Sequence, residues 1–378
     1  MTGEYWATEL PLLRPGMLLG QSGGNKPFPF SHPGVQYVHF ARNAIYALAK
    51  QFRLAGADVL VQAYFHGVEV EALLAAGARP RFFPVHAGMQ VDPDEIRGMI
   101  RGETRAVYLI HYLGFPGPVK ALRRLCDEHG LLLIEDCALA LLSRSEGEWL
   151  GSIGDAAVFC VYKTLPTPDG GAAVMKDDRL RFDGLLPRPL GTARETAAAL
   201  LVGLESSRNS GVRALARSTR VVGRALSRRT QSDWVHVGTQ NFVPDDAALL
   251  MSPISRRIIA RQDFDSVVHA RRRNYAHLQN LLSDVSPAVF PELPDGVCPL
   301  FYPFAATHKR ELWAKLRAAG IQSVLFWLTT DLATPPGEFP EVDTLRQTIL
   351  ELPCHQDMTP EGIERVAATV RTCVRGLA

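Results

Sequence analysis

The chain has 378 residues, of which 47% are hydrophobic and 21% are charged, so it can bury a large core and exceeds the usual size of one domain. Forty-one basic and thirty-nine acidic side chains give a formal net charge of +2, which favours neither nucleic acid nor an acidic surface as an obligate partner. The six cysteines include no CxxC pair, and the most apolar stretches are too short to cross a membrane. We therefore expect a cytoplasmic protein without a membrane span.

Helix-like and strand-like segments alternate between residues 40 and 176. Helical periodicity covers 41–56, 69–77, 93–100 and 118–130, and apolar runs typical of buried strands cover 58–64, 79–85, 104–114, 131–137, 155–162 and 171–176. This alternation predicts an α/β fold with a mostly parallel central sheet flanked by helices. In such sheets, ligands bind beyond the carboxyl ends of the strands.

The strand pattern stops between residues 187 and 273, where the text is helix-forming and includes an arginine-rich segment at about 193–230. A smaller α+β region then follows. Its expected strands cover 301–306 and 322–328, its helices 309–320 and 360–376, and a Pro/Gly-rich surface loop 333–342. We predict three parts: an N-terminal arm (1–35), a large domain (36–240), and a helical connection with a small C-terminal α+β domain (241–378).

One lysine stands in an unusual place. The chain has seven lysines against thirty-four arginines, and Lys163 alone follows an apolar strand and precedes a Gly-Gly pair, Gly170 and Gly171. A buried ammonium group is costly unless it is paired or used chemically. The alternative is a solvated turn residue beside the prolines at 166 and 168. The other lysines, at positions 26, 50, 120, 176, 309 and 315, are expected at the surface.

A carboxylate ends the preceding strand. Asp136 closes an apolar run 27 residues before Lys163, and an unpaired carboxylate there would be expensive, so we expect it to hold a cationic partner. An Asp at the pyridinium nitrogen and a Lys in Schiff-base linkage are the two groups that pyridoxal phosphate needs. Tyr64, Phe65 and His66, directly after another strand, offer a flat side chain for the ring face.

Several strings, in order, carry a family resemblance: "NAIYAL", "LCDEHGLLLIEDCA", "GSIGDAAVF", "KTLPTPDGG" and "FPEVDTLRQTILELPCHQDMTPEGIERVA". From about residue 36 to the C-terminus, the chain resembles the DegT/DnrJ/EryC1/StrS family of pyridoxal-phosphate-dependent, sugar-type aminotransferases. The resemblance implies the type I aminotransferase fold and a homodimer. It also implies transfer of an amino group from a small-molecule donor to a keto or aldehyde carbon of a sugar or biosynthetic intermediate, through an internal aldimine.

The resemblance assigns roles residue by residue. Lys163 matches the Schiff-base lysine and Asp136 the partner of the pyridine nitrogen. His66 takes the place of the aromatic residue that stacks on the ring. Arg42 and Asn43 lie where family members have the turn that meets the cofactor phosphate at a helix start.

The chain also departs from the family pattern. Leu139 replaces a Gln that usually touches the phenolic oxygen, and Tyr162 replaces the Ser or Thr that commonly precedes the lysine. Asn241 is a candidate for the Asn that reaches the phosphate of a neighbouring subunit. These departures leave open a pyridoxal phosphate enzyme of another reaction type (aldol-like, elimination or decarboxylation). A second alternative is a catalytically idle protein of this fold that binds a partner through its arginine-rich helix.

Five arginines share one face of a predicted helix. Arg213, Arg217, Arg220, Arg224 and Arg228 follow one another at spacings of three or four residues. A solvated helix face explains such a stripe. The functional interpretations are a docking face for an acidic carrier protein, a phosphorylated substrate or an anionic membrane surface.

Overall fold

The computed structural model describes residues 5–19, 24–187, 189–205, 211–212, 214–216, 218–219, 241–328, 334 and 337–377. All five arginines of the stripe between Arg213 and Arg228 lie outside these residues, so the predicted docking face is not described. Within the described part, α7 (Pro189–Glu205) agrees with the helical character expected there. No described helix combines the length and the apolar character that a membrane crossing requires.

A seven-stranded sheet forms the centre of the larger part of the molecule. Its strands are β1 (Gln36–Val38), β2 (Asp58–Gln62), β3 (Arg79–Phe83), β4 (Thr104–Ile110), β5 (Leu132–Cys137), β8 (Ala156–Cys160) and β9 (Gly171–Met175), in the order β1-β9-β8-β5-β4-β2-β3. β3, β2, β4, β5 and β8 are parallel, whereas β9 runs antiparallel to β8 and β1 antiparallel to β9. The mostly parallel α/β sheet predicted from the sequence is confirmed.

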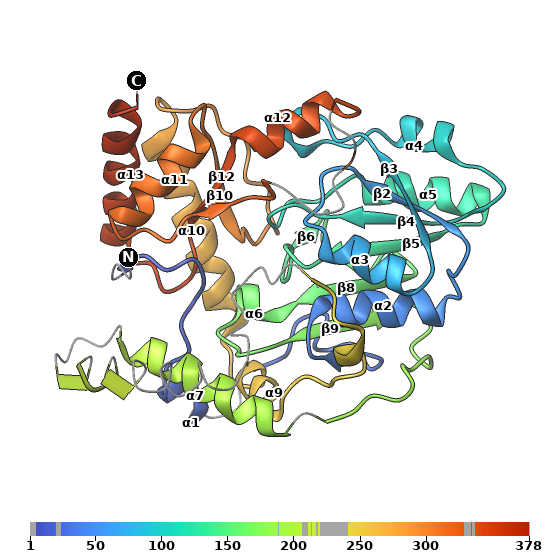
Figure 1. The fold of residues 1–378 in the computed structure, drawn as a ribbon, viewed down its shortest axis with the longest axis horizontal. Helices are drawn as coiled ribbons and strands as arrows, with labels where there is room; N and C mark the ends of the chain where they lie inside the picture. Colours follow the sequence, from blue (N-terminus) through green and yellow to red (C-terminus); the bar gives the residue numbers. More distant parts are fainter. Residues whose placement is uncertain are drawn as a thin grey trace.

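Helices cover both faces of this sheet (Figure 1). They are α2 (Ala41–Gln51), α3 (Val68–Ala75), α4 (Pro93–Met99) and α5 (Val119–His129). Alternate residues of each strand supply the two cores: Val107 and Leu109 pack in the core that includes α4 and α5, while Ala106 and Tyr108 pack in the core that includes α2 and α3. The strands are apolar on both faces because both faces are covered.

A second, three-stranded sheet lies beside the first (Figure 1). Its strands are β10 (Phe301–Ala305), β12 (Ile349–Pro353) and β11 (Val324–Leu325), in the order β10-β12-β11, and all pairs are antiparallel. Its helices are α10 (Phe264–Leu282), α11 (Lys309–Ala318), α12 (Pro340–Thr348) and α13 (Pro360–Arg375). The N-terminal segment joins this part, since Ala7 bridges to Ile321 and the Trp6 indole donates to the Ala319 carbonyl at 2.9 Å.

Short elements complete the described structure: α1 (Gly16–Leu19), η1 (Ala87–Met89), the hairpin β6 (Arg144–Ser145) and β7 (Glu148–Trp149), α6 (Val161–Thr164), η2 (Pro244–Asp246) and α9 (Pro253–Ile259). Two expectations are wrong in extent. The strand predicted over 322–328 pairs only at Val324 and Leu325, and the chain then turns at Trp327, whose φ is 41°. The loop predicted over 333–342 already enters α12 at Pro340.

Backbone conformation and close packing explain why glycine occupies both positions 170 and 171 after Lys163. Gly170 has a φ of 148°, which other residues rarely adopt. A Cβ atom on Gly171 would lie 2.3 Å from the carbonyl carbon of Phe40 and 2.5 Å from the nitrogen of Ala41. The absence of a side chain therefore lets β9 pass directly against the first turn of α2.

We predict that Gly171→Ala lowers the free energy of unfolding by about 1–3 kcal/mol, because the added methyl group forces β9 and α2 apart. Urea titration measures the change. Gly98→Ala in α4 is the matched control, since a Cβ there meets no atom within 4 Å and the substitution should be neutral or slightly stabilising. Equal stability of Gly171→Ala and the unchanged protein would contradict the packing argument.

Candidate active site

A cavity of about 60 Å³ lies at the carboxyl ends of the parallel strands. Four of the six residues proposed from the sequence line it: Lys163, Asp136, His66 and Arg42. They come from α6, β5, the loop after β2 and the first turn of α2. Because β4, β5 and β8 are neighbours in the sheet, their carboxyl ends deliver side chains to one place.

Asp136 is held by two donors. Its Oδ2 accepts a hydrogen bond from the Tyr108 hydroxyl at 2.7 Å, and its Oδ1 accepts from the Ala138 N–H at 2.8 Å. Burial raises the pKa of this carboxyl above its ordinary value, while the Tyr108 and Ala138 hydrogen bonds and the charge of Lys163 oppose the rise. A cation placed against the carboxylate would relieve the remaining cost of its burial.

Lys163 lies half-buried in the short helix α6, immediately after β8. Its ammonium group makes no hydrogen bond or ion pair with the described residues. Lys163 is therefore not the solvated turn residue that the sequence left as an alternative, because its side chain lines the same cavity as Asp136. An unpaired amine in a cavity is available for chemistry.

His66 presents its ring to the cavity with an unsatisfied atom. Its Nδ1 is buried and has no hydrogen-bond partner among the described residues. Burial lowers the pKa of His66 to about 3, assisted by the positive charges of Lys163, Arg42 and Arg346. The imidazole is therefore neutral at ordinary pH, which suits a ring that stacks on a flat ligand.

The other two proposed residues do not line the cavity. The Asn43 side chain is buried and donates to the carbonyl of Asp246. Asn241 is exposed and precedes Phe242, whose N–H donates to the carboxylate of Glu71. Within a single chain, the structure thus leaves Arg42 at the start of α2 as the proposed phosphate-side residue that reaches the cavity.

Glu69 is a cavity residue that sequence reasoning missed. Its Oε1 accepts from the His66 N–H at 2.7 Å and its Oε2 from the Gly67 N–H at 3.1 Å, so it fixes the backbone that carries the imidazole. Burial, followed by repulsion from Asp136, raises the pKa of Glu69 to about 7. Acidic residues are common in the first turn of a helix, so nothing in the sequence distinguished Glu69 from an ordinary residue of this kind.

Arg346 of α12 joins the smaller sheet to the site. Its guanidinium donates to the carbonyls of Ala63 at 3.1 Å, Phe65 at 3.3 Å and Trp327 at 2.7 Å. Those first two carbonyls belong to the loop that leads to His66. No sequence pattern marks a side chain that binds main-chain carbonyls nearly 300 positions away.

Lys309 corrects one expectation. We predicted it at the surface, but its side chain is buried and its Nζ donates to the carbonyls of Phe326 at 2.9 Å and Arg346 at 2.8 Å. Burial lowers the pKa of this ammonium group to about 7. Lys309 begins an amphipathic helix, where a long side chain ordinarily extends into solvent.

His111, Glu135 and Cys137 form a buried group whose atoms could hold a metal ion. The His111 Nδ1 accepts from the Gly117 N–H at 3.0 Å, so the proton of a neutral ring lies on Nε2, which donates to Glu135 at 3.0 Å. Glu135 also accepts N–H groups of Gly151 and Gly154. These bonds already engage His111 and Glu135, and burial raises the pKa of the Cys137 thiol well above its ordinary value, which disfavours the thiolate that a metal would need.

The residues at the site fit pyridoxal phosphate. The buried carboxylate of Asp136 forms no direct ion pair within the described residues, the His66 imidazole has an unpartnered buried nitrogen, and the Lys163 amine lines the same cavity. A pyridinium N–H, a ring face and an aldehyde carbon are the matching groups of the cofactor. Leu139 and Tyr162, the two departures from the family pattern, also line the cavity.

Comparison with known proteins decides the family. The sequence profile of the DegT/DnrJ/EryC1/StrS aminotransferase family matches residues 35–202 and 254–371. The chain belongs to this family. It is 28% identical to the dTDP-3-amino-3,4,6-trideoxy-alpha-D-glucose transaminase of Micromonospora megalomicea subsp. nigra over 326 residues, which cover 82% of this chain and 76% of that protein.

A second relative matches more closely over a shorter range. Identity to the GDP-perosamine synthase of Vibrio cholerae is 34% over 126 residues, which span about a third of each protein: 32% of this chain and 34% of the synthase. Among solved structures, the fold is similar to that of Helicobacter pylori PseC, an aminotransferase involved in the biosynthesis of pseudoaminic acid. The TM-score is 0.68 at 16% identity, covering 99% of this chain and 100% of that one.

The pKa of Glu69 predicts a pH dependence of stability. Between its ordinary value of 4.5 and about 7, the folded protein keeps a proton that the unfolded chain has released, so stability falls as pH rises through this window. The loss should reach about 3 kcal/mol and should be smaller in Glu69→Gln, which cannot ionise. Urea titrations across the window measure it, with exposed Glu311→Gln as control. Parallel pH profiles for the unchanged protein and Glu69→Gln would refute the assignment.

Proposed function

We propose that the chain is a pyridoxal-phosphate-dependent aminotransferase that transfers an amino group to the keto carbon of a sugar. The observation that carries the proposal is the convergence of Lys163, Asp136 and His66 on one cavity in a chain of this family. The Asp136 carboxylate can bind a pyridinium N–H, the His66 imidazole can stack on a ring face, and the Lys163 amine can bond to an aldehyde carbon. The cofactor offers these three groups.

The residues have separate tasks in this proposal. When bound, pyridoxal phosphate supplies an electron-accepting ring that stabilises negative charge at the substrate carbon. Asp136 would keep the ring nitrogen protonated, and His66 would cover one ring face. Lys163 would hold the cofactor's aldehyde carbon until an amino donor displaces it, after which its free Nζ would move the proton of the substrate Cα. Arg42 would face the cofactor phosphate.

The sugar substrate is proposed from the relatives. The names of two of them describe a GDP-linked and a dTDP-linked amino sugar, so a nucleotide-linked keto sugar is the acceptor that we would test first. A homodimer would allow Asn241 of one copy to reach the phosphate of the other, which remains a prediction from the sequence. Docking of an acidic carrier protein on the Arg213–Arg228 face is likewise a prediction from the sequence.

We predict that Lys163→Ala loses covalent attachment of the cofactor and lowers the reaction rate by at least about 10²-fold, because no other lysine lines the cavity. Borohydride reduction of the protein with bound pyridoxal phosphate, followed by peptide mapping, should place the adduct on Lys163. Exposed Lys176→Met should behave as the unchanged protein. An adduct on a different lysine would sink the assignment.

The activity itself is tested with a panel of amino acids. The protein loaded with pyridoxal phosphate should convert the cofactor to its amine form with at least one donor, and a nucleotide-linked keto sugar should reverse the conversion. Asp136→Asn should fold, since its side-chain oxygen can still accept from Ala138, but should react about 10²-fold more slowly.

The same panel separates the alternatives. Release of carbon dioxide or an elimination product without formation of the amine would favour another pyridoxal phosphate reaction. Cofactor binding without any reaction across the panel, or no binding at all, would favour the idle scaffold and contradict the proposed activity.

A further inference from the structure

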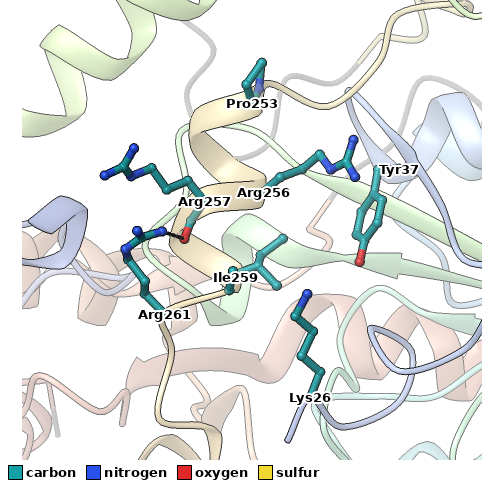
Figure 2. Close-up of a pocket in the computed structure, with 8 residues that line it drawn as sticks. Lys26, Tyr37, Pro253, Arg256, Arg257, Ile259 and Arg261 are labelled. Atoms are coloured by element: carbon teal, nitrogen blue, oxygen red, sulfur yellow. Dashed lines mark hydrogen bonds between the residues drawn. The ribbon is translucent and has the colours of Figure 1, made fainter. Parts of the chain in front are cut away.

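A second cavity, of about 350 Å³, lies between the N-terminal loop, β1 and α9 (Figure 2). Lys26 reaches it from the loop, Tyr37 from β1, and Arg256, Arg257 and Ile259 from α9, with Arg261 just beyond the helix. It shares no lining residue with the cavity of Lys163. Its volume lies within the range of about 300–1,000 Å³ that is typical of small-molecule sites.

The charge around this cavity is one-sided. Four cationic side chains line it, and none of the described lining residues is acidic. Lys26 and Arg256 form no ion pair with the part of the chain that the structure describes. Arg257 and Arg261, four positions apart, carry like charges that repel each other. This concentration of positive charge is local, because the whole chain carries a net charge of only +2.

Two of the arginines are fixed by main-chain contacts. Arg257 donates from Nε to the Leu18 carbonyl at 3.2 Å, and Arg261 donates to the Arg257 carbonyl at 3.2 Å. Both contacts are made to neutral carbonyl groups of the main chain. An anion in the cavity would lower the electrostatic energy of Lys26 and Arg256, which form no ion pair within the described residues.

Three donors converge on one side of the cavity. The Lys26 ammonium and the Tyr37 hydroxyl point toward each other, and the Arg256 guanidinium lies beside the tyrosine, 5.1 Å above its ring (Figure 2). Burial raises the pKa of Tyr37, so its hydroxyl keeps its proton and can donate. None of these three groups has a hydrogen-bond partner among the described side chains. Ile259, which is 2% exposed, adds an apolar wall.

We propose that this cavity binds a small phosphorylated molecule. Its phosphate would accept hydrogen bonds from Lys26, Tyr37 and Arg256, because three donors from different directions match a group with three equivalent oxygens. The apolar or ring part of the ligand would lie against Ile259. This site is separate from the aminotransferase cavity and does not rest on the proposed reaction.

The test uses phenyl phosphate and inorganic phosphate as probes, titrated calorimetrically into the full chain at low ionic strength. The protein is first saturated with pyridoxal phosphate and freed of excess, so that the cavity of Lys163 does not compete, and the titration is repeated without this step. Lys26→Met and Arg256→Gln should each lower the affinity for phenyl phosphate by about tenfold, which is the effect of removing one charge-assisted hydrogen bond. Both residues are exposed, so the melting temperature should not change.

Matched controls are Lys176→Met and Arg310→Gln, which remove exposed cations elsewhere and should leave binding unchanged. Tighter binding of phenyl phosphate than of inorganic phosphate would support an organic phosphate as the ligand. Equal affinities, both reduced in Lys26→Met, would support the anion site and assign it to free phosphate. Absence of binding to the unchanged protein, or equal binding to Lys26→Met and Lys176→Met, would overturn the proposal.

Discussion

The burial of Asp136 is the constraint on which the candidate site depends. An ionised carboxylate in an apolar interior is costly, so the structure must supply donors and a cation around it. The order β8-β5-β4 does this: β4 brings the Tyr108 hydroxyl, β5 carries Asp136 itself, and α6, directly after β8, carries Lys163. A different strand order would separate these three groups. The sheet topology and the local chemistry thus require each other.

Two further buried carboxyl groups, those of Glu69 and Glu351, interact with the charge of Lys163. Glu69 supports the loop of His66, and Glu351 on β12 is buried with a pKa raised to about 8, mainly by burial, against the opposing charges of Lys163 and Lys309. Both carboxyl groups are poised to change protonation near neutral pH. A neutral His66 adds no charge, so the negative charge near Lys163 beyond that of Asp136 depends on the protonation of Glu69 and Glu351.

The sequence predicted the central sheet because apolar runs alternate with amphipathic helices, and it predicted Lys163 and Asp136 because a charge after an apolar run is conspicuous. It did not predict β1, which is only three residues long, or β12, whose apolar run Glu351 interrupts. The support from Arg346 was equally invisible, since its acceptors are main-chain carbonyls that any sequence provides. A charged residue directly after an apolar run can be recognised in the sequence as a candidate for burial. A side chain whose partners are main-chain carbonyls far away in the sequence cannot.

The Arg346 contacts also limit how the protein can move. The guanidinium belongs to the helix that precedes β12, and it is hydrogen-bonded to carbonyls on both sides of the His66 approach, at Ala63, Phe65 and Trp327. Hinging of the small sheet away from the large one would leave the buried carbonyls of Ala63 and Phe65 without donors, at a cost of about 1–3 kcal/mol for each. The Arg346 contacts therefore oppose separation of the two sheets beside the cavity, and any opening there must first break them.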